Sequence, residues 1–369
     1  MVTTFIGFQI LVNLRTQYVD LNGRTDLQVV VDREDGQYLG HPTTLLLPNG
    51  KSILCVYPRG HGSGQILYKR SDDAGKTWSE RLATPSSWAT SKETPTIHRL
   101  TDAHGKSRLL LWSGLYPART SISEDEGKSW TELSPAGNWG GIVVMSALEP
   151  VRGQKGAYAA YFHDDGRFFH DGKIATGIFT MFRSLTLDGG LTWAAPTTIL
   201  SRGDLHLCEP GIIRSPNGKT LAMLLRENKR VRNSQIMFSH DEGLTWTEPR
   251  DLPSELTGDR HVGKYLKDGR LFIGFRDISP KGTATPTDGD WVGWIGSFDD
   301  LEKGLPGQYR IRLKDNTSTW DCGYSGVEVL RDGTVVTTTY GHWDQGQQPY
   351  IMCVRFNPSK MPELRPIKH

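Results

Sequence analysis

Short runs of apolar residues recur along the chain, and most of them are paired across a turn that contains Asn-Gly or Asp-Gly. Such turns favour β-hairpins, because glycine readily adopts the positive φ that a tight connection requires. Two weaker turn signals, at His104-Gly105 and around 153–156, lie between similar runs. The pattern therefore predicts an all-β chain of consecutive hairpins. The clearest pairs are Thr43 to Leu47 with Ser52 to Tyr57, Gly211 to Arg214 with Thr220 to Leu225, His261 to Leu266 with Leu271 to Phe275, and Val327 to Leu330 with Thr334 to Thr339.

An octet of the form Ser/Thr-x-Asp-x-Gly-x-Thr/Ser-Trp occurs four times, ending at Trp78, Trp130, Trp193 and Trp246. The successive Trp residues are 52, 63 and 53 positions apart, a period typical of one four-stranded sheet with its connections. The Asp can accept hydrogen bonds from its own turn, and the Trp can hold that turn against the sheet. We interpret the octets as structural. A degraded fifth copy, Ser297 to Leu301, lacks the Gly and Trp and indicates a fifth sheet with a different turn.

These octets resemble the Asp-box, or bacterial neuraminidase repeat, of the sialidase superfamily, whose members are six-bladed β-propellers. The resemblance implies a six-bladed β-propeller with four-stranded antiparallel blades, formed by residues 1–369 as a single domain. Residues 1–26 are expected to be an N-terminal extension, and residues 27–33 a strand that closes the ring in the last blade. The Asp-box occurs in proteins of unrelated activity, so it indicates the fold and not the function.

Composition agrees with a folded β protein and narrows the partners. The 369 residues include 41 Gly and 20 Pro, which suit many short strands joined by turns. The net charge is only +2, and basic residues are not interleaved with aromatics in a run, so we expect no nucleic-acid partner. No apolar stretch approaches the roughly 18 residues of a membrane span, so we expect none.

The four cysteines, Cys55, Cys208, Cys322 and Cys353, form no Cys-x-x-Cys and have no histidine spacing suited to zinc. We interpret them as free thiols and expect no metal and no cofactor. The N-terminal residues contain no basic segment followed by a cleavage site, so any export signal is absent or already removed. The compartment stays open between secreted or periplasmic and cytoplasmic.

The two inner strands of a propeller blade are antiparallel, so residues just before the first and just after the second lie on the same face. We predict that these positions converge on one central depression and form an anion-binding, carboxylate-assisted site. They are His41 and Arg59, Glu93 and Trp112, Glu209 and Arg226, Arg260, His261 and Arg276, and Asp321, Tyr324 and His342, with Met145, Ser146 and 162–165 nearest in blade three.

Two of these segments resemble catalytic segments of the sialidases, in which three arginines hold the substrate carboxylate, a Tyr activated by a Glu is the nucleophile, and an Asp is the acid/base. The segment Cys208-Glu209-Pro210-Gly211 and the later Arg226 resemble the blade-four pattern, and Gly323-Tyr324-Ser325 resembles the start of the last blade. The resemblance implies that Glu209 is the base, Arg226 a carboxylate clamp and Tyr324 the nucleophile. A tyrosine with a pKa near 10 needs such a carboxylate to take its proton.

The chain also departs from that pattern. His41 stands where the family has its first arginine, and Arg276 ends the second strand of blade five, whereas the family's arginine commonly precedes the third. We expect Arg59 to complete a cluster with Arg226 and Arg276. The segment after Arg59 offers no Asp, so His61 is the candidate acid; alternatively, it is an incidental histidine in a glycine-rich loop. The remaining expected substrate-binding residues are His41, Glu93, Arg260, His261 and His342.

These residues predict a divergent sialidase-like glycoside hydrolase that removes a terminal acidic sugar, such as a sialic acid, from an acidic glycan or sialoglycoconjugate. Two alternatives stay open. One is a non-catalytic carbohydrate-binding propeller, which the missing Asp favours. The other is a glycosidase or lyase for another uronic or ulosonic acid. The pair Glu209 and Tyr324 favours catalysis, because binding alone needs no activated phenol.

Overall fold

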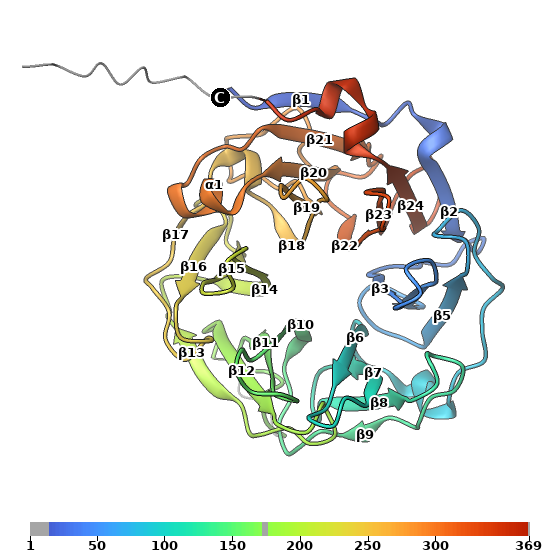
Figure 1. The fold of residues 1–369 in the computed structure, drawn as a ribbon, viewed down its shortest axis with the longest axis vertical. Helices are drawn as coiled ribbons and strands as arrows, with labels where there is room; N and C mark the ends of the chain where they lie inside the picture. The colour runs from blue at the N-terminus through green and yellow to red at the C-terminus, as the bar shows by residue number, and fades with distance from the viewer. Residues whose placement is uncertain (1–14, 172–175, 368–369) are drawn as a thin grey trace, which may run out of the picture.

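Six β-sheets stand around a central axis in the computed structural model, which describes residues 15–171 and 176–367 (Figure 1). Each sheet has its first strand nearest the axis, and consecutive strands pair outward. The fold is therefore an all-β six-bladed propeller, as predicted. Within the described ranges the only α-helix is α1 (Phe298–Lys303), which is far too short to cross a bilayer.

The blades follow one another along the chain. Blade one holds β3 (Thr43–Leu46), β4 (Ile53–Pro58) and β5 (Ile66–Ser71). Blade two holds β6 (Thr96–Thr101), β7 (Ser107–Ser113), β8 (Arg119–Ser123) and β9 (Ser134–Pro135). Blade three holds β10 (Ile142–Pro150), β11 (Tyr158–Asp164), β12 (Thr180–Thr186) and β13 (Thr197–Ser201). Blade four holds β14 (Leu207–Arg214), β15 (Leu221–Glu227), β16 (Gln235–Ser239) and β17 (Arg250–Asp251). Blade five holds β18 (Asp259–Tyr265), β19 (Leu271–Arg276), β20 (Trp291–Gly296), β21 (Tyr309–Lys314) and β1 (Gln17–Asp20). Blade six holds β22 (Gly323–Val329), β23 (Val335–Gly341), β24 (Tyr350–Phe356) and β2 (Gln28–Asp32). Short 3-10 helices span Thr25–Leu27, Ser86–Thr90, Ser254–Leu256, Pro358–Lys360 and Pro362–Leu364.

All the predicted inner hairpins form, but the blades are not uniform. Four blades have four strands, whereas blade one has three among the described residues and blade five has five. The extra strand is β1, which runs parallel to β21 with Gln17 opposite Tyr309. Strand β2 pairs antiparallel with β24, with Val29 opposite Cys353, so blade six contains strands from both ends of the chain (Figure 1). Of the expected N-terminal extension, residues 1–14 lie outside the described residues.

The four Asp-boxes are tight turns that follow the third strand of blades one to four. In the first, Asp73 accepts hydrogen bonds from the backbone N–H groups of Lys76 (3.0 Å) and Thr77 (2.9 Å) and from the Thr77 hydroxyl (2.7 Å). The same carboxylate-to-turn contacts recur at Asp125, Asp188 and Asp241. The structural interpretation of the octets is therefore confirmed.

Each Asp-box also fastens its blade to the preceding blade. Trp193 of blade three packs edge-on against Trp112 of blade two, with ring centroids 5.0 Å apart. Trp246 of blade four meets Tyr161 of blade three in the same way, at 5.8 Å. The buried hydroxyl of Tyr68 in blade one donates a hydrogen bond to the carbonyl of Gly127 in the next Asp-box (2.9 Å). Much of the core therefore lies between blades, and the octets hold it together.

The degraded fifth octet forms a helix instead of a tight turn. Ser297 is the N-cap of α1: its hydroxyl accepts from the Asp300 N–H (3.1 Å), and the Asp300 carboxylate accepts from the Ser297 N–H (2.7 Å). Gly304, at φ 68°, ends the helix. The predicted fifth sheet with a different connection is confirmed, and the loss of the Gly and Trp coincides with this reciprocal cap.

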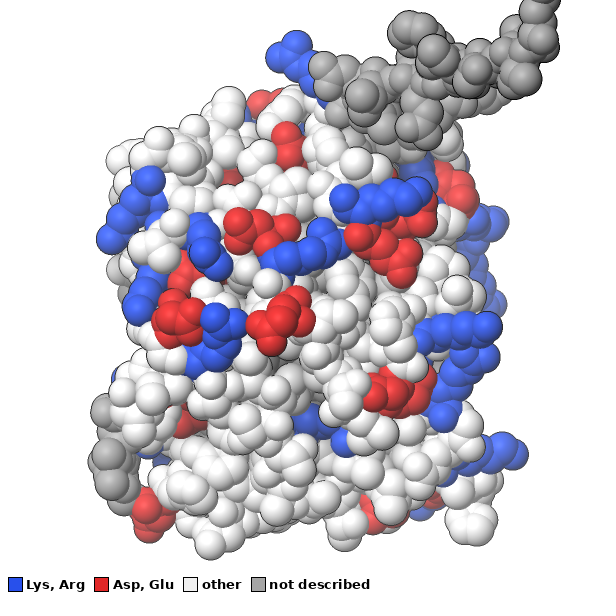
Figure 2. Space-filling model, turned by 90° about the vertical axis from the view of Figure 1, so that its left-hand side faces the viewer, with Lys and Arg blue, Asp and Glu red and all other residues white. Residues whose placement is uncertain are grey.

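Charges of both signs are mixed on the outer wall of the propeller shown in Figure 2. Many are paired, as are Arg202 with Asp204 (2.7 Å) and Lys303 with Asp299 (2.6 Å). The four cysteines are all buried and free, as expected from the sequence. Several strongly buried charges, by contrast, lie at the ends of the inner strands, namely Glu209, Asp259, Arg260 and Arg276.

We predict that replacing Trp193 by Ala lowers the free energy of unfolding by about 3–5 kcal/mol, because it empties the contact between blades two and three. Leu191 in the same octet is 52% exposed, so Leu191→Ala should change the free energy of unfolding by no more than about 0.5 kcal/mol. Urea unfolding of both variants measures the difference. Equal effects would show that the indole does not join the blades.

Candidate active site

The innermost strands of blades four, five and six share one irregularity near their first residues. Each holds one residue more than its neighbour, because the pairs Cys208 with Arg226, Asp259 with Arg276 and Gly323 with Tyr340 are followed by pairs shifted by one. The next residue of each strand is left-handed: Glu209 (φ 53°), Arg260 (φ 55°) and Tyr324 (φ 67°), and His41 (φ 52°) has the same conformation just before β3. A residue with a side chain adopts it at a cost of about 1–3 kcal/mol, so these positions combine strain with candidate chemistry.

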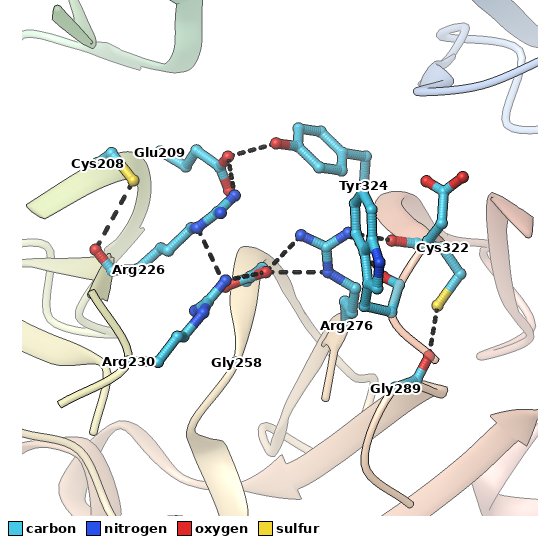
Figure 3. Close-up of polar contacts among 12 residues, drawn as sticks. Cys208, Glu209, Arg226, Arg230, Gly258, Arg276, Gly289, Cys322 and Tyr324 are labelled. Carbon is cyan, nitrogen blue, oxygen red and sulfur yellow. Dashed lines mark hydrogen bonds and ion pairs between the residues drawn. The ribbon is translucent and has the colours of Figure 1, made fainter. Parts of the chain in front are cut away.

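Two of these strained residues meet across the axis. The hydroxyl of Tyr324, in blade six, donates a short hydrogen bond to Oε1 of Glu209, in blade four. The same oxygen accepts from Arg226 Nη1 at 2.8 Å (Figure 3). Both side chains are buried, and Oε2 of Glu209 has no hydrogen-bond partner among the described residues. The predicted contact between the phenol and the carboxylate is therefore present, with one carboxylate oxygen to spare.

The environment keeps the proton on the tyrosine. Burial, and then the Glu209 charge, raise the pKa of Tyr324 well above its usual value. Burial alone would raise the pKa of Glu209 as well, but Arg226, the hydrogen bond from Tyr324 and Arg276 together hold that pKa below its usual range. Glu209 is consequently an ionised base already bonded to the proton of a neutral phenol.

The arginines gather around a carboxylate of the protein itself. Asp259 is fully buried and accepts from Arg230 Nη1 (2.6 Å), Arg230 Nη2 (2.7 Å) and Arg276 Nε (2.9 Å), while Arg226 Nε lies 3.4 Å away (Figure 3). Burial acts to raise the pKa of Asp259, but the guanidiniums, Arg226 first, hold it far below its usual value. Asp259 is thus a permanent anion at the centre of the cluster.

The expected trio of Arg59, Arg226 and Arg276 is wrong in one member. Arg59 is 43% exposed and forms its ion pair with Glu34, which Arg81 also contacts at 2.7 Å. Arg230, from the loop after β15, takes the third place instead. Arg59 follows β4 and continues into a glycine-rich segment, so its side chain is directed by that loop and not by the strand.

A second polar cluster surrounds Asp321. Its carboxylate accepts from the hydroxyls of Tyr38 (2.8 Å) and Tyr340 (3.2 Å). Nε2 of His342 lies 3.1 Å and Nε2 of His61 3.6 Å from its two oxygens. The His61 side chain is 55% exposed, so it stands between this buried carboxylate and the solvent. This arrangement gives His61 a partner that the loop sequence did not reveal.

His41 links the two clusters. Its Nδ1 accepts from the Gly62 N–H (3.1 Å), which places the remaining proton on Nε2, 3.2 Å from the Tyr340 hydroxyl. Its ring stands edge-on to Tyr324, with centroids 4.4 Å apart. Burial lowers the pKa of His41 well below its usual value, so it is a neutral residue at neutral pH.

The remaining predicted residues divide between the pocket and the core. Arg260 donates to the Ser146 carbonyl (2.9 Å), and its guanidinium lies 6.0 Å from the Tyr324 ring centroid. Burial lowers the pKa of Arg260, and the charges of Glu209 and of buried Glu93 act in the opposite direction. His261 is wrong as a pocket residue: its Nε2 donates to the Leu256 carbonyl (2.9 Å), and its ring stacks on a core phenylalanine.

Trp112 is also wrong as a pocket residue, because it is fully buried between blades two and three. The side chain of Met145 lies outside the described residues. Sequence reasoning missed Asp259, Arg230, Tyr38 and Tyr340. Asp259 had a usable signal, since it directly precedes Arg260 at a strand start, whereas Arg230 lies in a loop and had none.

Known proteins resemble this chain in part of its sequence and in its overall fold. Residues 110–276 match the model of a BNR repeat-like domain, and among curated proteins no sequence matches the chain. A protein of unknown function from Dyadobacter fermentans has 18% identity and a TM-score of 0.66, over 89% of this chain and 97% of that one. The NanB sialidase from Streptococcus pneumoniae has 10% identity and a TM-score of 0.62, over 90% and 70%. The intramolecular trans-sialidase from Ruminococcus gnavus has 13% identity and a TM-score of 0.60, over 90% of this chain and 96% of that one.

At such identities the solved structures establish the fold. Together with the Asp-boxes and the six blades, they show that the chain has the six-bladed propeller fold that the solved sialidases also have, and that residues 110–276 contain a BNR repeat-like domain. The reaction and the substrate have to be inferred from the pocket itself.

We predict that the protein loses stability as the pH falls from about 6.5 to 4, partly through His163. This buried histidine accepts a hydrogen bond from the Glu209 N–H (3.4 Å), and burial lowers its pKa to about 4. Between these pH values the histidine is protonated in the unfolded chain but stays neutral in the folded protein. The free energy of unfolding therefore falls by about 2–4 kcal/mol per such group. Urea unfolding at pH 7 and pH 4.5 should show a smaller loss for His163→Gln than for the wild type. The exposed His104→Gln is the control, and identical slopes for all three proteins would contradict the assignment.

Proposed function

We propose that the protein is a glycoside hydrolase in which Tyr324 attacks the anomeric carbon of a sugar bound at the mouth of the propeller. The observation that carries this proposal is the hydrogen bond from the Tyr324 hydroxyl to Glu209. A buried phenol with a raised pKa is not a nucleophile until a base takes its proton. A carboxylate with a purely structural role would not need to accept a hydrogen bond from this hydroxyl. The sialidase fold of the chain adds to this support.

In the first step, a bond forms between Tyr324 Oη and the anomeric carbon as the phenolic proton passes to Glu209. The bond from the anomeric carbon to the leaving oxygen breaks, and that oxygen takes a proton from an acid. Since the pKa of Tyr324 is raised, the proton moves during the attack and not before it. Arg226, 2.8 Å from the accepting oxygen, keeps Glu209 ionised until then.

His61 is the proposed acid, in place of the aspartate that the resemblance implies. Its imidazole is exposed at the mouth, and its Nε2 lies 3.6 Å from a carboxylate oxygen of Asp321. In the second step a water attacks the anomeric carbon and gives its proton to His61. Tyr324 leaves and recovers its proton from Glu209. Two displacements at the same carbon retain the anomeric configuration.

The sequence predicts a terminal acidic sugar such as a sialic acid, and the solved structures with the same fold include sialidases. A non-catalytic carbohydrate-binding propeller stays the second candidate, because the segment after Arg59 holds His61 and no carboxylate. Turnover of a glycoside distinguishes the hydrolase from the binding protein, because only the hydrolase needs the Tyr324 hydroxyl as a nucleophile.

We predict that Tyr324→Phe lowers kcat/KM on a cleavable aryl glycoside by at least about 10³-fold, because the nucleophilic oxygen is lost. Glu209→Gln should lower it by about 10²–10⁴-fold through loss of the base. A panel of fluorogenic glycosides, carboxylated and uncharged, in both anomeric forms, provides the assay. Tyr161→Phe is the control, because Tyr161 is equally buried but lies in blade three away from Glu209.

Mass spectrometry adds an independent measurement. A fluorinated glycoside that slows the second step should leave one sugar attached to the peptide that contains Tyr324. Unchanged activity of Tyr324→Phe would refute the nucleophile, and sugar binding without turnover in the wild type would favour the binding protein.

A further inference from the structure

We propose that the pocket accepts a glycoside whose sugar carries no carboxylate at the anomeric carbon, because Asp259 already occupies the guanidinium cluster. This inference rests on the glycosidase function proposed above and specifies its substrate class. It replaces the acidic sugar predicted from the sequence by an uncharged one.

The guanidinium edges that could grip a carboxylate are already in use. Arg230 presents both terminal nitrogens to Asp259, at 2.6 and 2.7 Å. Arg276 directs Nε and Nη2 to Asp259 and donates Nη1 to the carbonyls of Trp320 (2.9 Å) and Cys322 (3.1 Å). Four of its five N–H groups are therefore accounted for. A substrate carboxylate would have to displace a buried anion to reach these forks.

The other positions around the mouth offer no replacement. His41, at the start of blade one, is neutral because burial lowers its pKa. Arg59 pairs with Glu34 instead of turning toward the cluster. Arg260 donates to the Ser146 carbonyl and lies over the Tyr324 ring. Arg226 is shared between Glu209 and Asp259.

The protein's own carboxylates already face these guanidiniums. Arg226, Arg230 and Arg276 form ion pairs with Glu209 or Asp259, and the charges of Glu209 and Glu93 act on buried Arg260. A site built for an anion keeps an excess of positive charge in a place of low dielectric, since that excess supplies the attraction. Here the protein supplies the negative charge itself.

What remains open at the mouth suits an uncharged sugar. Trp320 is 52% exposed, beside His61 at a centroid distance of 6.3 Å, and offers an apolar ring face to the C–H side of a pyranose. Oε2 of Glu209 is buried and has no hydrogen-bond partner among the described residues. His61 and Asp321 line the same side. An exposed aromatic face and polar partners are thus present, whereas the donor forks of Arg230 and Arg276 are occupied by Asp259.

The direct test compares ligands that differ only in charge. Wild-type protein is titrated by calorimetry with N-acetylneuraminic acid and with the primary amide of the same sugar. We expect the acid to bind no more tightly than the amide, and uncharged aryl glycosides to be cleaved with a kcat/KM at least about 10-fold above that of carboxylated ones. Tighter binding of the acid by about 10-fold or more would overturn the inference.

A gain-of-function variant provides the second test. Asp259→Ala vacates the cluster, so it should acquire affinity for acetate and for N-acetylneuraminic acid, seen as a rise in Tm on adding either, while the wild-type Tm stays constant. Asp32→Ala is the control, because Asp32 is also buried and paired with two cations, Lys69 and Arg81, but lies on β2 of blade six. A wild-type Tm that responds to these anions as much as the variant's would overturn the proposal. If Asp259→Ala does not fold, the comparison of acid and amide decides alone.

The two proposals fail differently. Cleavage of carboxylated glycosides that depends on Tyr324 would refute the uncharged substrate and leave the glycosidase intact. Absence of all cleavage would refute the glycosidase, while the acid and amide titrations would still show whether the guanidinium cluster accepts an external carboxylate.

Discussion

The pocket depends on one backbone constraint, the extra residue near the start of the innermost strands in blades four, five and six. A strand normally alternates its side chains between two faces, both of which are packed against neighbouring blades in a propeller. The bulge interrupts that alternation and turns Glu209, Arg260 and Tyr324 toward the axis. Glycine would adopt this conformation without strain, so the side chains at these points are held there by the surrounding blades.

The ion cluster then fixes what the bulges bring together. Burying a carboxylate and several guanidiniums is costly unless every charge is matched, and Asp259 achieves this by contacting arginines from β15, the following loop and β19. Arg226 extends the network to Glu209 and therefore to Tyr324. Asp259 thus helps to position the reactive pair without touching the phenol, because it holds the Arg226 side chain that contacts Glu209.

Sequence patterns predicted the hairpins, the Asp-box turns and the contact of Glu209 with Tyr324, because each depends on local turn chemistry or on a strand end. The sequence patterns failed where the direction of a side chain depends on a bulge or on the course of a loop. His261 directly follows a bulged Arg260, and alternation sends it into the blade. Arg59 and Arg230 leave their strands for loops, whose course has no periodicity. Asp259 was overlooked although it precedes Arg260 at a strand start, because the arginines that surround it come from other segments of the chain.

The N-terminal strands have a consequence for assembly. Strand β1 covers the outer edge of β21, and β2, a few residues later, covers the outer edge of β24 (Figure 1). One short strap therefore shields two adjacent sheet edges, each of which would otherwise present unpaired N–H and C=O groups to the solvent. A protein that released this strap would expose both edges at once, and the strap of a second copy would fit them equally well. The hydrogen bonds that hold the strap within one chain would equally hold it between two, which is the geometry of a domain-swapped dimer.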